Sequence, residues 1–264
     1  MAREPMAREK VATRLHVEET LVAGQVVGLD HGRAHFLRTV LRLQVGAQVA
    51  LFNGRDGEWS AELEGLGKGW ASLVVGQQRR PQAAEADLWL VFAPIKRGRI
   101  DFLIEKATEL GCSELHPALT RFTAVDRVNT DRLAANAKEA AEQCERLSVP
   151  TVAPPRDLGK MIDAWPEERH LLICAERGEA VPIGEALAEA SEAGLGTHPW
   201  AVLIGPEGGF AEHELTALTR LPRAHFVGLG PRILRADTAG VAALTCWQAW
   251  LGDWHRRPPG RGST

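Results

Sequence analysis

The chain has 264 residues, of which 45% are hydrophobic, and a formal net charge of -3 at pH 7. This length allows one large domain or two small ones, and the hydrophobic content is ordinary for a soluble globular protein. No apolar run approaches about 18 residues and no apolar stretch follows the charged N-terminus, so we expect neither a membrane span nor a secretory signal.

The first part of the chain is predicted to be a small β-domain. Residues 1–11 are expected to form a disordered N-terminus, and residues 12–76 contain short strand-like runs separated by turn signals. One helical stretch, residues 34–43, interrupts the strands and carries an apolar stripe on one face and Arg38 and Arg42 on the other. A small β-barrel with one helix fits this pattern.

The second part of the chain is predicted to be an α/β domain. The polar segment 77–87 lacks periodicity and is expected to be a linker, and residues 255–264 are expected to be a flexible tail. Between them, in residues 88–254, apolar runs of strand length alternate with helical stretches, which is typical of a parallel sheet covered on both faces. The expected strands are residues 88–93, 114–119, 170–175, 201–204 and 225–229, and the expected helices are residues 99–110, 131–146, 182–193, 211–220 and 237–251.

A glycine-rich turn, Gly205 to Gly209, follows the expected strand 201–204 directly. Open α/β sheets bind ligands at the carboxyl ends of their strands, so this turn is a candidate ligand site, although a tight turn without a ligand would show the same pattern. The spacing matches neither the P-loop nor the dinucleotide fingerprint, and Glu207 would repel a phosphate. A glycine loop that keeps a carboxylate suits a cationic ligand better.

A second loop of the same kind follows the expected strand 225–229. It contains Arg232 and Arg235, and Asp237 is expected to cap the helix that comes next. A lone pair of arginines usually lies on a solvated surface. Two ligand-type loops after successive strands favour a binding site instead.

The distribution of the basic residues is more informative than the net charge. Arginine far outnumbers lysine, and its planar fork suits phosphates and base edges. The local clusters are Arg33, His35, Arg38 and Arg42; Lys96, Arg97 and Arg99; and Arg232 and Arg235.

The cysteines and histidines predict no disulfide and no metal site. The four cysteines form no C-x-x-C pair, which favours free thiols in a reducing compartment. His31 and His35 are four residues apart, but Gly32 between them indicates a turn.

The two loops together resemble the signature of a known enzyme family. VLIGPEGGF at residues 202–210 and GLGPRILRADTA at residues 228–239 resemble the RsmE family, the uracil-N3 methyltransferases of 16S ribosomal RNA in the SPOUT superfamily. The resemblance covers nearly the whole chain, because residues 35–54, 95–123 and 139–150 also resemble family segments. Two positions depart from the family pattern: Glu145 stands where a small residue is expected, and Asp237 where Glu is usual.

This resemblance implies the fold, the cofactor and the partners. The fold would be an N-terminal PUA-like β-barrel that binds RNA, followed by a C-terminal SPOUT α/β domain with a parallel sheet and a trefoil knot. The cofactor would be S-adenosyl-L-methionine, and the partner would be 16S ribosomal RNA within the small ribosomal subunit, in the cytoplasm and away from membranes. A homodimer is also implied, and the surplus of large apolar groups in residues 237–254 favours it. These groups are Val241, Leu244, Trp247, Trp250, Leu251 and Trp254.

The chemistry of methyl transfer to N3 of uracil selects the candidate site residues. N3 must lose a weakly acidic proton, and the charge that develops on O2 and O4 needs cationic donors nearby. The catalytic candidates, at positions that match family arginines, are Arg235, Arg146 and Arg121. The expected cofactor-binding residues are Glu176, Ile204, Gly205, Pro206, Glu207, Gly208, Gly209, Leu229, Gly230, Ile233, Leu234, Thr238 and Ala239. The expected RNA-binding residues are Arg33, His35, Arg38, Arg42, Lys96, Arg99 and Arg232.

Other functions stay open on the sequence alone. A knotted methyltransferase that acts on another base or on a ribose hydroxyl would share the cofactor loops. A catalytically silent RNA-binding protein would share the fold, although the intact glycine loop argues against it. A nucleotide-binding oxidoreductase lacks its glycine fingerprint.

Overall fold

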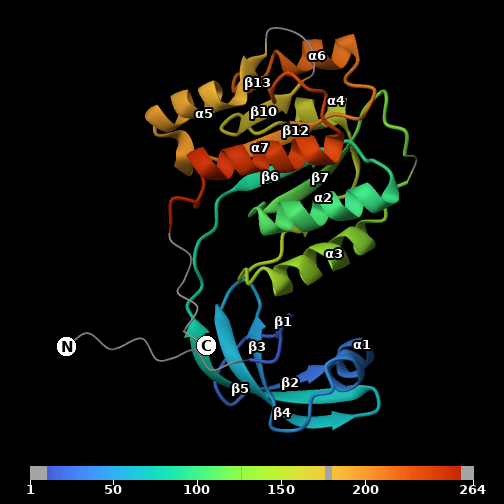
Figure 1. Ribbon diagram of the computed structural model, residues 1–264, viewed down its shortest axis with the longest axis vertical. Coiled ribbons are helices and arrows are strands. Elements are labelled where there is room, and N and C mark those ends of the chain that lie inside the picture. Colours follow the sequence, from blue (N-terminus) through green and yellow to red (C-terminus); the bar gives the residue numbers. More distant parts are fainter. Residues whose placement is uncertain (1–10, 126, 176–179, 257–264) are drawn as a thin grey trace, which may run out of the picture. The chain divides into compact units, whose positions relative to one another are not determined.

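The computed structural model describes residues 11–125, 127–175 and 180–256, which form two compact units (Figure 1). Among the described residues, the first unit contains residues 11–84 and Ala141–Val149, and the second contains the remainder. Residues 141–149 therefore group with the N-terminal unit, although the sequence assigned them to the second domain. None of the helices in these ranges has the length and apolar character that crossing a bilayer requires.

The first unit is built on a five-stranded sheet with the order β1-β3-β4-β5-β2. Its strands are β1 (Arg14–His16), β2 (Val26–Leu29), β3 (Gln48–Phe52), β4 (Glu58–Gly67) and β5 (Trp70–Arg80). Strands β1 and β3 are parallel and the other pairs are antiparallel. Strand β5 continues through residues 77–80, the first four residues of the expected linker.

The helix of the first unit differs from the prediction at both ends. Helix α1 (His31–His35) begins earlier than expected because the Asp30 side chain accepts a hydrogen bond from the backbone N–H of Arg33, so Gly32 lies in a helix and not in a turn. The helix continues as a π-helical segment, η1 (Phe36–Val40). Arg42 lies beyond it with φ 54°, so the expected common helical face for Arg38 and Arg42 does not form.

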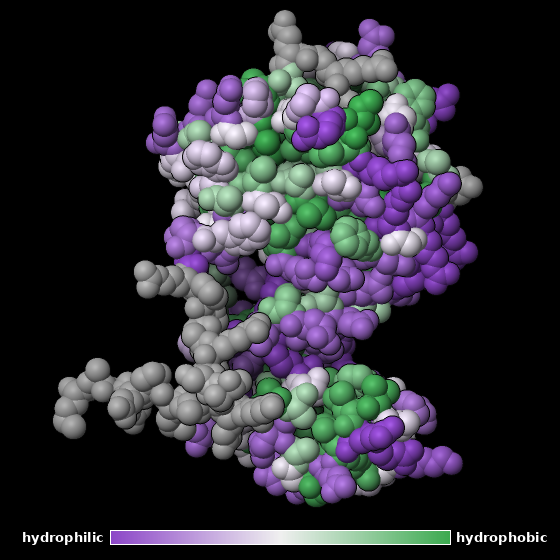
Figure 2. All heavy atoms as spheres, in the orientation of Figure 1, coloured by the Kyte–Doolittle hydropathy of each residue, from purple (hydrophilic) through white to green (hydrophobic). Residues whose placement is uncertain are grey.

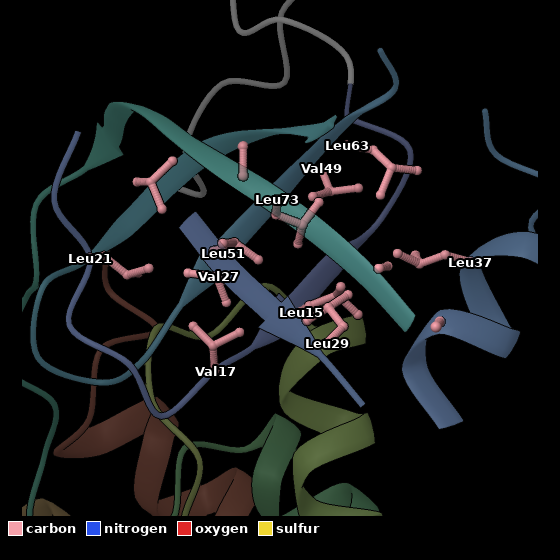
Figure 3. Packing of buried hydrophobic residues seen from close by; sticks show 14 residues of the cluster. Leu15, Val17, Leu21, Val27, Leu29, Leu37, Val49, Leu51, Leu63 and Leu73 are labelled. Carbon is pink, nitrogen blue, oxygen red and sulfur yellow. The ribbon is translucent and has the colours of Figure 1, made fainter. Parts of the chain in front are cut away.

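The core of the first unit consists of the apolar side chains that alternate along its strands (Figure 3). Leu15, Leu51, Leu63 and Leu73 are fully enclosed, and Leu37 of η1 joins them. This burial supplies the main stabilisation of the unit and fixes the strand register, because a slip by one residue would turn these side chains outward.

The second unit is built on a parallel sheet with the order β11-β13-β10-β12-β6-β7-β8, and β9 pairs with β7. Its strands are β6 (Leu88–Phe92), β7 (Glu114–Leu119), β8 (Thr151–Val152), β9 (Arg156–Asp157), β10 (His170–Cys174), β11 (Val181–Pro182), β12 (Trp200–Ile204) and β13 (Ala224–Gly228). The five predicted apolar runs are all strands, and three short strands add to them.

Helices cover both faces of this sheet, as the alternating pattern predicted (Figure 1). They are α2 (Arg97–Glu109), α4 (Leu158–Asp163), α5 (Ile183–Glu192), α6 (Glu212–Leu218) and α7 (Ala236–Trp250), with a short 3-10 turn, η2 (Leu195–Thr197). A further helix, α3 (Thr130–Gln143), lies next to α2, where Arg132 and Asn136 contact Asp101. Helices α4 and α6 pack with Ala201 and Leu203 on one face. Helix α7 packs against α2 and β12 on the other, and Gly240 permits this approach, since a Cβ there would lie 2.7 Å from Leu103 Cδ1.

Candidate functional site

Both predicted ligand loops lie at the carboxyl edge of the parallel sheet. Residues 205–210 follow β12 and residues 229–235 follow β13. These strands are not neighbours, because β10 lies between them and pairs with both. The end of β10 therefore belongs to the same edge, which is where open parallel sheets bind ligands. Glu176, a predicted cofactor contact just after β10, lies outside the described residues.

Local packing explains two of the glycines in the loop after β12. A Cβ at Gly205 would lie 2.9 Å from the Phe210 ring, so the ring packs directly over this glycine. Gly209 has φ 71°, a left-handed conformation that side chains other than glycine rarely adopt. At Gly208 a Cβ would approach the Cβ of Phe122 to 3.1 Å. Phe122 comes from the turn after β7, so that turn borders the glycine loop.

A buried carboxylate, Glu214, joins these two segments. Its Oε2 accepts a hydrogen bond from the backbone N–H of Ala211 at 2.7 Å, and its Oε1 accepts one from the backbone N–H of Arg121 at 2.8 Å. The first contact is the N3-to-cap half of a capping box, whereas the second spans 93 residues of sequence. Glu214 is not among the site residues predicted from the sequence. Its cap spacing was the available signal. Through Glu214, the structure holds Arg121, a predicted catalytic residue with an exposed side chain, beside the glycine loop.

The loop after β13 offers unused hydrogen-bond donors. Gly230 has φ 93°, and among the described residues no hydrogen bond engages the backbone N–H groups of Gly230 or of residues 232–234. Ile233 is 85% exposed, which is unusual for a large apolar side chain. Leu229 and Leu234 are half-buried. The loop therefore presents free peptide donors next to an exposed apolar side chain.

The start of α7 follows this loop and differs in detail from the prediction. The helix begins at Ala236 with Arg235 as its cap residue, so Asp237 is not the N-cap but lies in the first turn, where its carboxylate accepts from Thr238 N–H at 2.9 Å. Arg232, Arg235 and Thr238 are exposed, and Ala239 is half-buried.

The loops fit S-adenosylmethionine on chemical grounds. Its adenine carries acceptors for free peptide N–H groups, and its cationic part suits the exposed carboxylate of Glu207. Pro206 and Ile204 are buried beneath the loop and give it a rigid base. Arg99 of α2 approaches Glu207, with 3.8 Å between Nη1 and Oε1, so one predicted RNA-binding residue borders the predicted cofactor loop. Lys96, exposed at the N-terminal end of α2, lies three residues before it.

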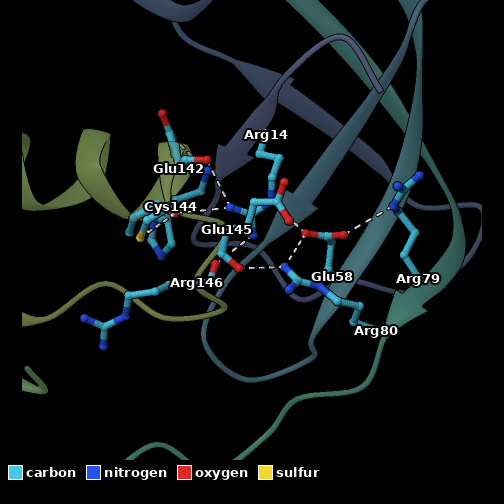
Figure 4. Close-up of polar contacts among 10 residues, drawn as sticks. Arg14, Glu58, Arg79, Arg80, Glu142, Cys144, Glu145 and Arg146 are labelled. Atoms are coloured by element: carbon cyan, nitrogen blue, oxygen red, sulfur yellow. Dashed lines mark hydrogen bonds and ion pairs between the residues drawn. The ribbon is translucent and has the colours of Figure 1, made fainter. Parts of the chain in front are cut away.

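Arg146, the third catalytic candidate, belongs to the first unit. The guanidinium of Arg14 holds its backbone: Nη2 donates to the carbonyl of Arg146 at 2.7 Å, and Nη1 donates to the carbonyls of Ala141 and Glu142 at 3.1 and 3.0 Å (Figure 4). The Arg146 side chain points away from this cluster, and its Nη2 contacts the Ser148 hydroxyl at 3.2 Å. Its placement relative to Arg121 and Arg235, which belong to the other unit, stays a prediction.

A buried ion-pair network supports Arg14. Glu58 accepts from Arg14 and Arg80 at 2.7 Å each, and Arg79 lies 3.3 Å from its other oxygen. Burial by itself raises the pKa of the Glu58 carboxyl, but hydrogen bonds and charges from Arg14 and Arg80 outweigh it and lower the pKa below its ordinary value. Arg80 also donates to the carbonyl of Glu145 at 2.8 Å. The network thus fixes residues 141–146 to β1, β4 and β5.

The predicted RNA-binding residues of the first unit lie around α1 and η1. His35, Arg38 and Arg42 are exposed. Arg33 is half-buried and lies 3.8 Å from Asp30, which reduces the charge that it offers to a phosphate. The four therefore share a region, but not a single helical face.

No disulfide joins the cysteines of the described residues. All four cysteines are free thiols. In the ranges that the structure describes, no three His, Cys, Asp or Glu side chains gather so that they could hold a metal ion.

Comparison with known proteins identifies both units. A family model described as an RNA methyltransferase domain matches residues 82–248, and one described as an RNA methyltransferase PUA domain matches residues 29–75. The ribosomal RNA small subunit methyltransferase E of Rickettsia conorii is 31% identical over 233 residues, which are 88% of this chain and 93% of the relative. The protein of the same name from Synechocystis is 33% identical over 249 residues, covering 91% and 78% of the two chains.

A solved structure shares the fold over the same extent. The crystal structure of a ribosomal RNA small subunit methyltransferase E from Neisseria gonorrhoeae bound to S-adenosyl methionine matches with a TM-score of 0.80 at 27% identity, covering 92% of this chain and 99% of that one. These matches confirm the resemblance and the predicted fold class, a PUA-like N-terminal domain followed by an α/β domain with a parallel sheet. The trefoil knot and the exact domain boundaries stay predictions.

Proposed function

Because the chain belongs to the RsmE family of RNA methyltransferases, we propose that it methylates N3 of one uridine in 16S ribosomal RNA with S-adenosylmethionine as the methyl donor. The observation that carries the proposal is the pair of loops at the carboxyl ends of β12 and β13. They combine free backbone donors, an exposed apolar side chain and a carboxylate at one edge of the sheet.

The proposed cofactor site uses both loops. The N–H groups of Gly230 and residues 232–234 would bind acceptors of the adenosine, Ile233 would cover its apolar faces, and Glu207 would face its cationic part. When bound, S-adenosylmethionine supplies an electrophilic methyl group. The cofactor site then fixes where a uracil ring must lie for in-line transfer.

The catalytic task of the protein is to stabilise the deprotonated uracil. The N3 proton leaves to solvent, and negative charge spreads over N3, O2 and O4. This charge is neutralised as N3 bonds to the methyl carbon and the carbon–sulfur bond of the methyl donor breaks. Arg235, at the junction of the second loop and α7, and Arg121, beside the glycine loop, carry exposed guanidinium groups at this edge. We propose that they donate to these oxygens, because fixed cationic donors gain most where charge develops in the transition state. Arg146 is the third candidate for this role.

We further propose that the protein acts as a homodimer in the cytoplasm, on RNA of the small ribosomal subunit. Leu244, Trp247 and Leu251 prove to be core residues, so they no longer favour a dimer. Trp250 and Trp254, which are 49% and 53% exposed, still do. Hydrophobic side chains also lie among hydrophilic ones on the face that carries α2 and α7 (Figure 2). A sedimentation run at micromolar protein that gave only the mass of one chain, 28.7 kDa, would contradict the dimer.

Nucleoside mapping tests the proposed reaction. Ribosomal RNA from a strain that lacks the protein is incubated with the protein and S-adenosylmethionine, digested and analysed by mass spectrometry. We expect 3-methyluridine at one position of the small-subunit RNA. A methyl group on another base or on a ribose would identify a different knotted methyltransferase. Failure to bind S-adenosylmethionine in calorimetry would indicate a catalytically silent RNA-binding protein.

A further inference from the structure

A hollow in the second unit is lined by no residue of either ligand loop. Its volume is about 300 Å³, and it lies between the start of α2 and the segment that leads from β7 into α3. Among the described residues that line it, there is neither aspartate nor glutamate. We call it the arginine hollow, because Arg97, Arg127 and Arg132 all contribute to its wall.

The polar side chains of the arginine hollow are arranged to donate hydrogen bonds. Arg97 and Arg127 are exposed and form no ion pair with any carboxylate in the described part of the chain. Arg132 pairs with Asp101, whose carboxylate also accepts from Asn136 Nδ2 at 2.9 Å, so this acid is already engaged. Asn129 accepts the backbone N–H of Arg132 on its Oδ1 at 3.0 Å, which leaves its amide nitrogen to donate. This set of cationic and amide donors favours a ligand that presents hydrogen-bond acceptors and negative charge.

The floor of the arginine hollow is apolar. Ile95 and Ile100 are buried beneath it, and Val125 and Val128 are half-buried at its side. A free inorganic anion gains nothing from such a floor. A nucleotide combines phosphate oxygens, which match the guanidinium forks, with a sugar and a flat base that can cover apolar side chains.

We propose that the arginine hollow binds one nucleotide of the RNA substrate, with Arg97 and Arg127 on its phosphodiester and the apolar floor against its sugar or base. The volume suits a single nucleotide, since ligand pockets begin at roughly 300 Å³. The inference rests on the proposed function, because it takes RNA as the substrate. It adds a substrate-holding site on the catalytic unit, made largely of residues that the sequence did not single out.

Salt-dependent RNA binding tests this site. The probe is a transcript of the small-subunit ribosomal RNA, and the protein is the full chain with either the double change Arg97→Ala and Arg127→Ala or the double change to Lys. We expect the Ala variant to bind about tenfold more weakly near 0.1 M salt. We also expect the slope of log affinity against log salt to fall by about 0.7 to 0.9 for each lost phosphate contact. The Lys variant should keep most of the slope, because it keeps the charge.

A matched control comes from a second hollow on α6. Arg220 lines it together with Glu212 and His213, so its charge is balanced locally. Arg220→Ala should change neither affinity nor slope. S-adenosylmethionine affinity, measured by calorimetry, should be the same in all variants, which shows that the fold is intact.

The outcomes separate this inference from the proposed function. Unchanged RNA affinity and slope in the Arg97 and Arg127 variant would overturn the arginine hollow as an RNA site, even where wild-type methylation succeeds. Competition with uridine monophosphate distinguishes the source of the nucleotide. If the variant loses binding of the free nucleotide but keeps RNA binding, the hollow is a small-molecule site and the proposal is wrong.

Discussion

Arg235 occupies the junction between the loop after β13 and helix α7, with an exposed side chain and an extended backbone. If it stabilises the uracil anion, Arg235→Ala should lower the maximal rate by about a hundredfold or more, with a smaller effect on RNA affinity. The reason is that the lost interaction strengthens only as charge develops. Single-turnover kinetics at saturating RNA and two salt concentrations measure both quantities.

Arg232, three residues earlier in the same loop, is the natural control for Arg235. It is exposed as well, and we expect Arg232→Ala to weaken RNA binding and reduce its salt dependence with little change in the maximal rate. If Arg235→Ala alters only RNA affinity, Arg235 is a phosphate contact, and Arg121 or Arg146 becomes the better catalytic candidate.

The turn after β7 packs closely against Gly208. A Cβ at Gly208 would lie 3.1 Å from the Cβ of Phe122 in that turn. Gly208→Val should push the loop and the turn after β7 apart and weaken S-adenosylmethionine binding by about tenfold, on the order of 1.4 kcal/mol. Calorimetry on the folded variant measures this. Adding Phe122→Ala should restore part of the affinity, and a double variant as weak as the single one would show that Phe122 is not the cause.

At the scale of secondary-structure elements, the strongest feature is the attachment of residues 141–146 to the first sheet by Arg14. This guanidinium pairs with buried Glu58 and donates to three backbone carbonyls. Arg14→Ala would leave Glu58 with one fewer partner and the carbonyls without their donor. We expect a loss of about 3 kcal/mol or more in the unfolding free energy of this unit, measured by urea denaturation.

The control for Arg14 is Arg38→Ala, an exposed change in the same unit, which should stay within about 0.5 kcal/mol of the parent. A similarly small effect of Arg14→Ala would mean that water replaces the guanidinium without cost. Within the segment that Arg14 holds, Glu145 has φ 63°, a left-handed conformation that favours glycine. This left-handed position also accounts for the small residue that the family pattern places there.

The elements with strong periodicity could be predicted from the sequence, and those set by distant contacts could not. The apolar runs at β6, β10 and β12 are long enough for the sequence alone to predict these strands. The position of β10 between β12 and β13 depends on strand pairing, which leaves no local signal. The bond from Glu214 to Arg121 likewise joins residues far apart in the chain. Short-range chemistry explains the error at α1, where the Asp30 cap starts the helix before the apolar stripe does.

At the scale of the whole molecule, the amino edge of the parallel sheet differs in chemistry from the carboxyl edge that carries the ligand loops. His170 stacks on Trp200 with 4.6 Å between ring centroids. His170 also contacts His225, with 3.2 Å between His170 Nδ1 and His225 Nε2. Arg223 Nη1 lies 3.1 Å from His170 Nε2. Because a guanidinium only donates, His170 Nε2 must accept, and the ring is therefore neutral with its proton on Nδ1.

This arrangement makes global stability depend on pH. Burial, followed by the charges of His225, Arg223 and His198, lowers the pKa of His170 to about 4 from an ordinary value of 6.5, and burial also lowers the pKa of His225. Between these values the unfolded chain binds more protons than the folded one, so the unfolding free energy should fall as the pH drops from 6.5 towards 4. Above pH 6.5 both states are neutral at His170, and its effect disappears. The slope for one histidine is at most about 1.4 kcal/mol per pH unit.

Chemical denaturation across this pH range, in the parent and in His170→Phe, tests the assignment. The phenyl ring can keep the stack on Trp200 but cannot take up a proton, so the acid-side slope should become shallower while stability at pH 8 changes less. His213→Gln, a change at an exposed histidine on α6, should leave the slope as it is. If His170→Phe loses stability equally at all pH values, the acid sensitivity arises elsewhere in the molecule. Because the stack lies at the amino ends of β10, β12 and β13, S-adenosylmethionine affinity in the variant should match the parent at pH 8.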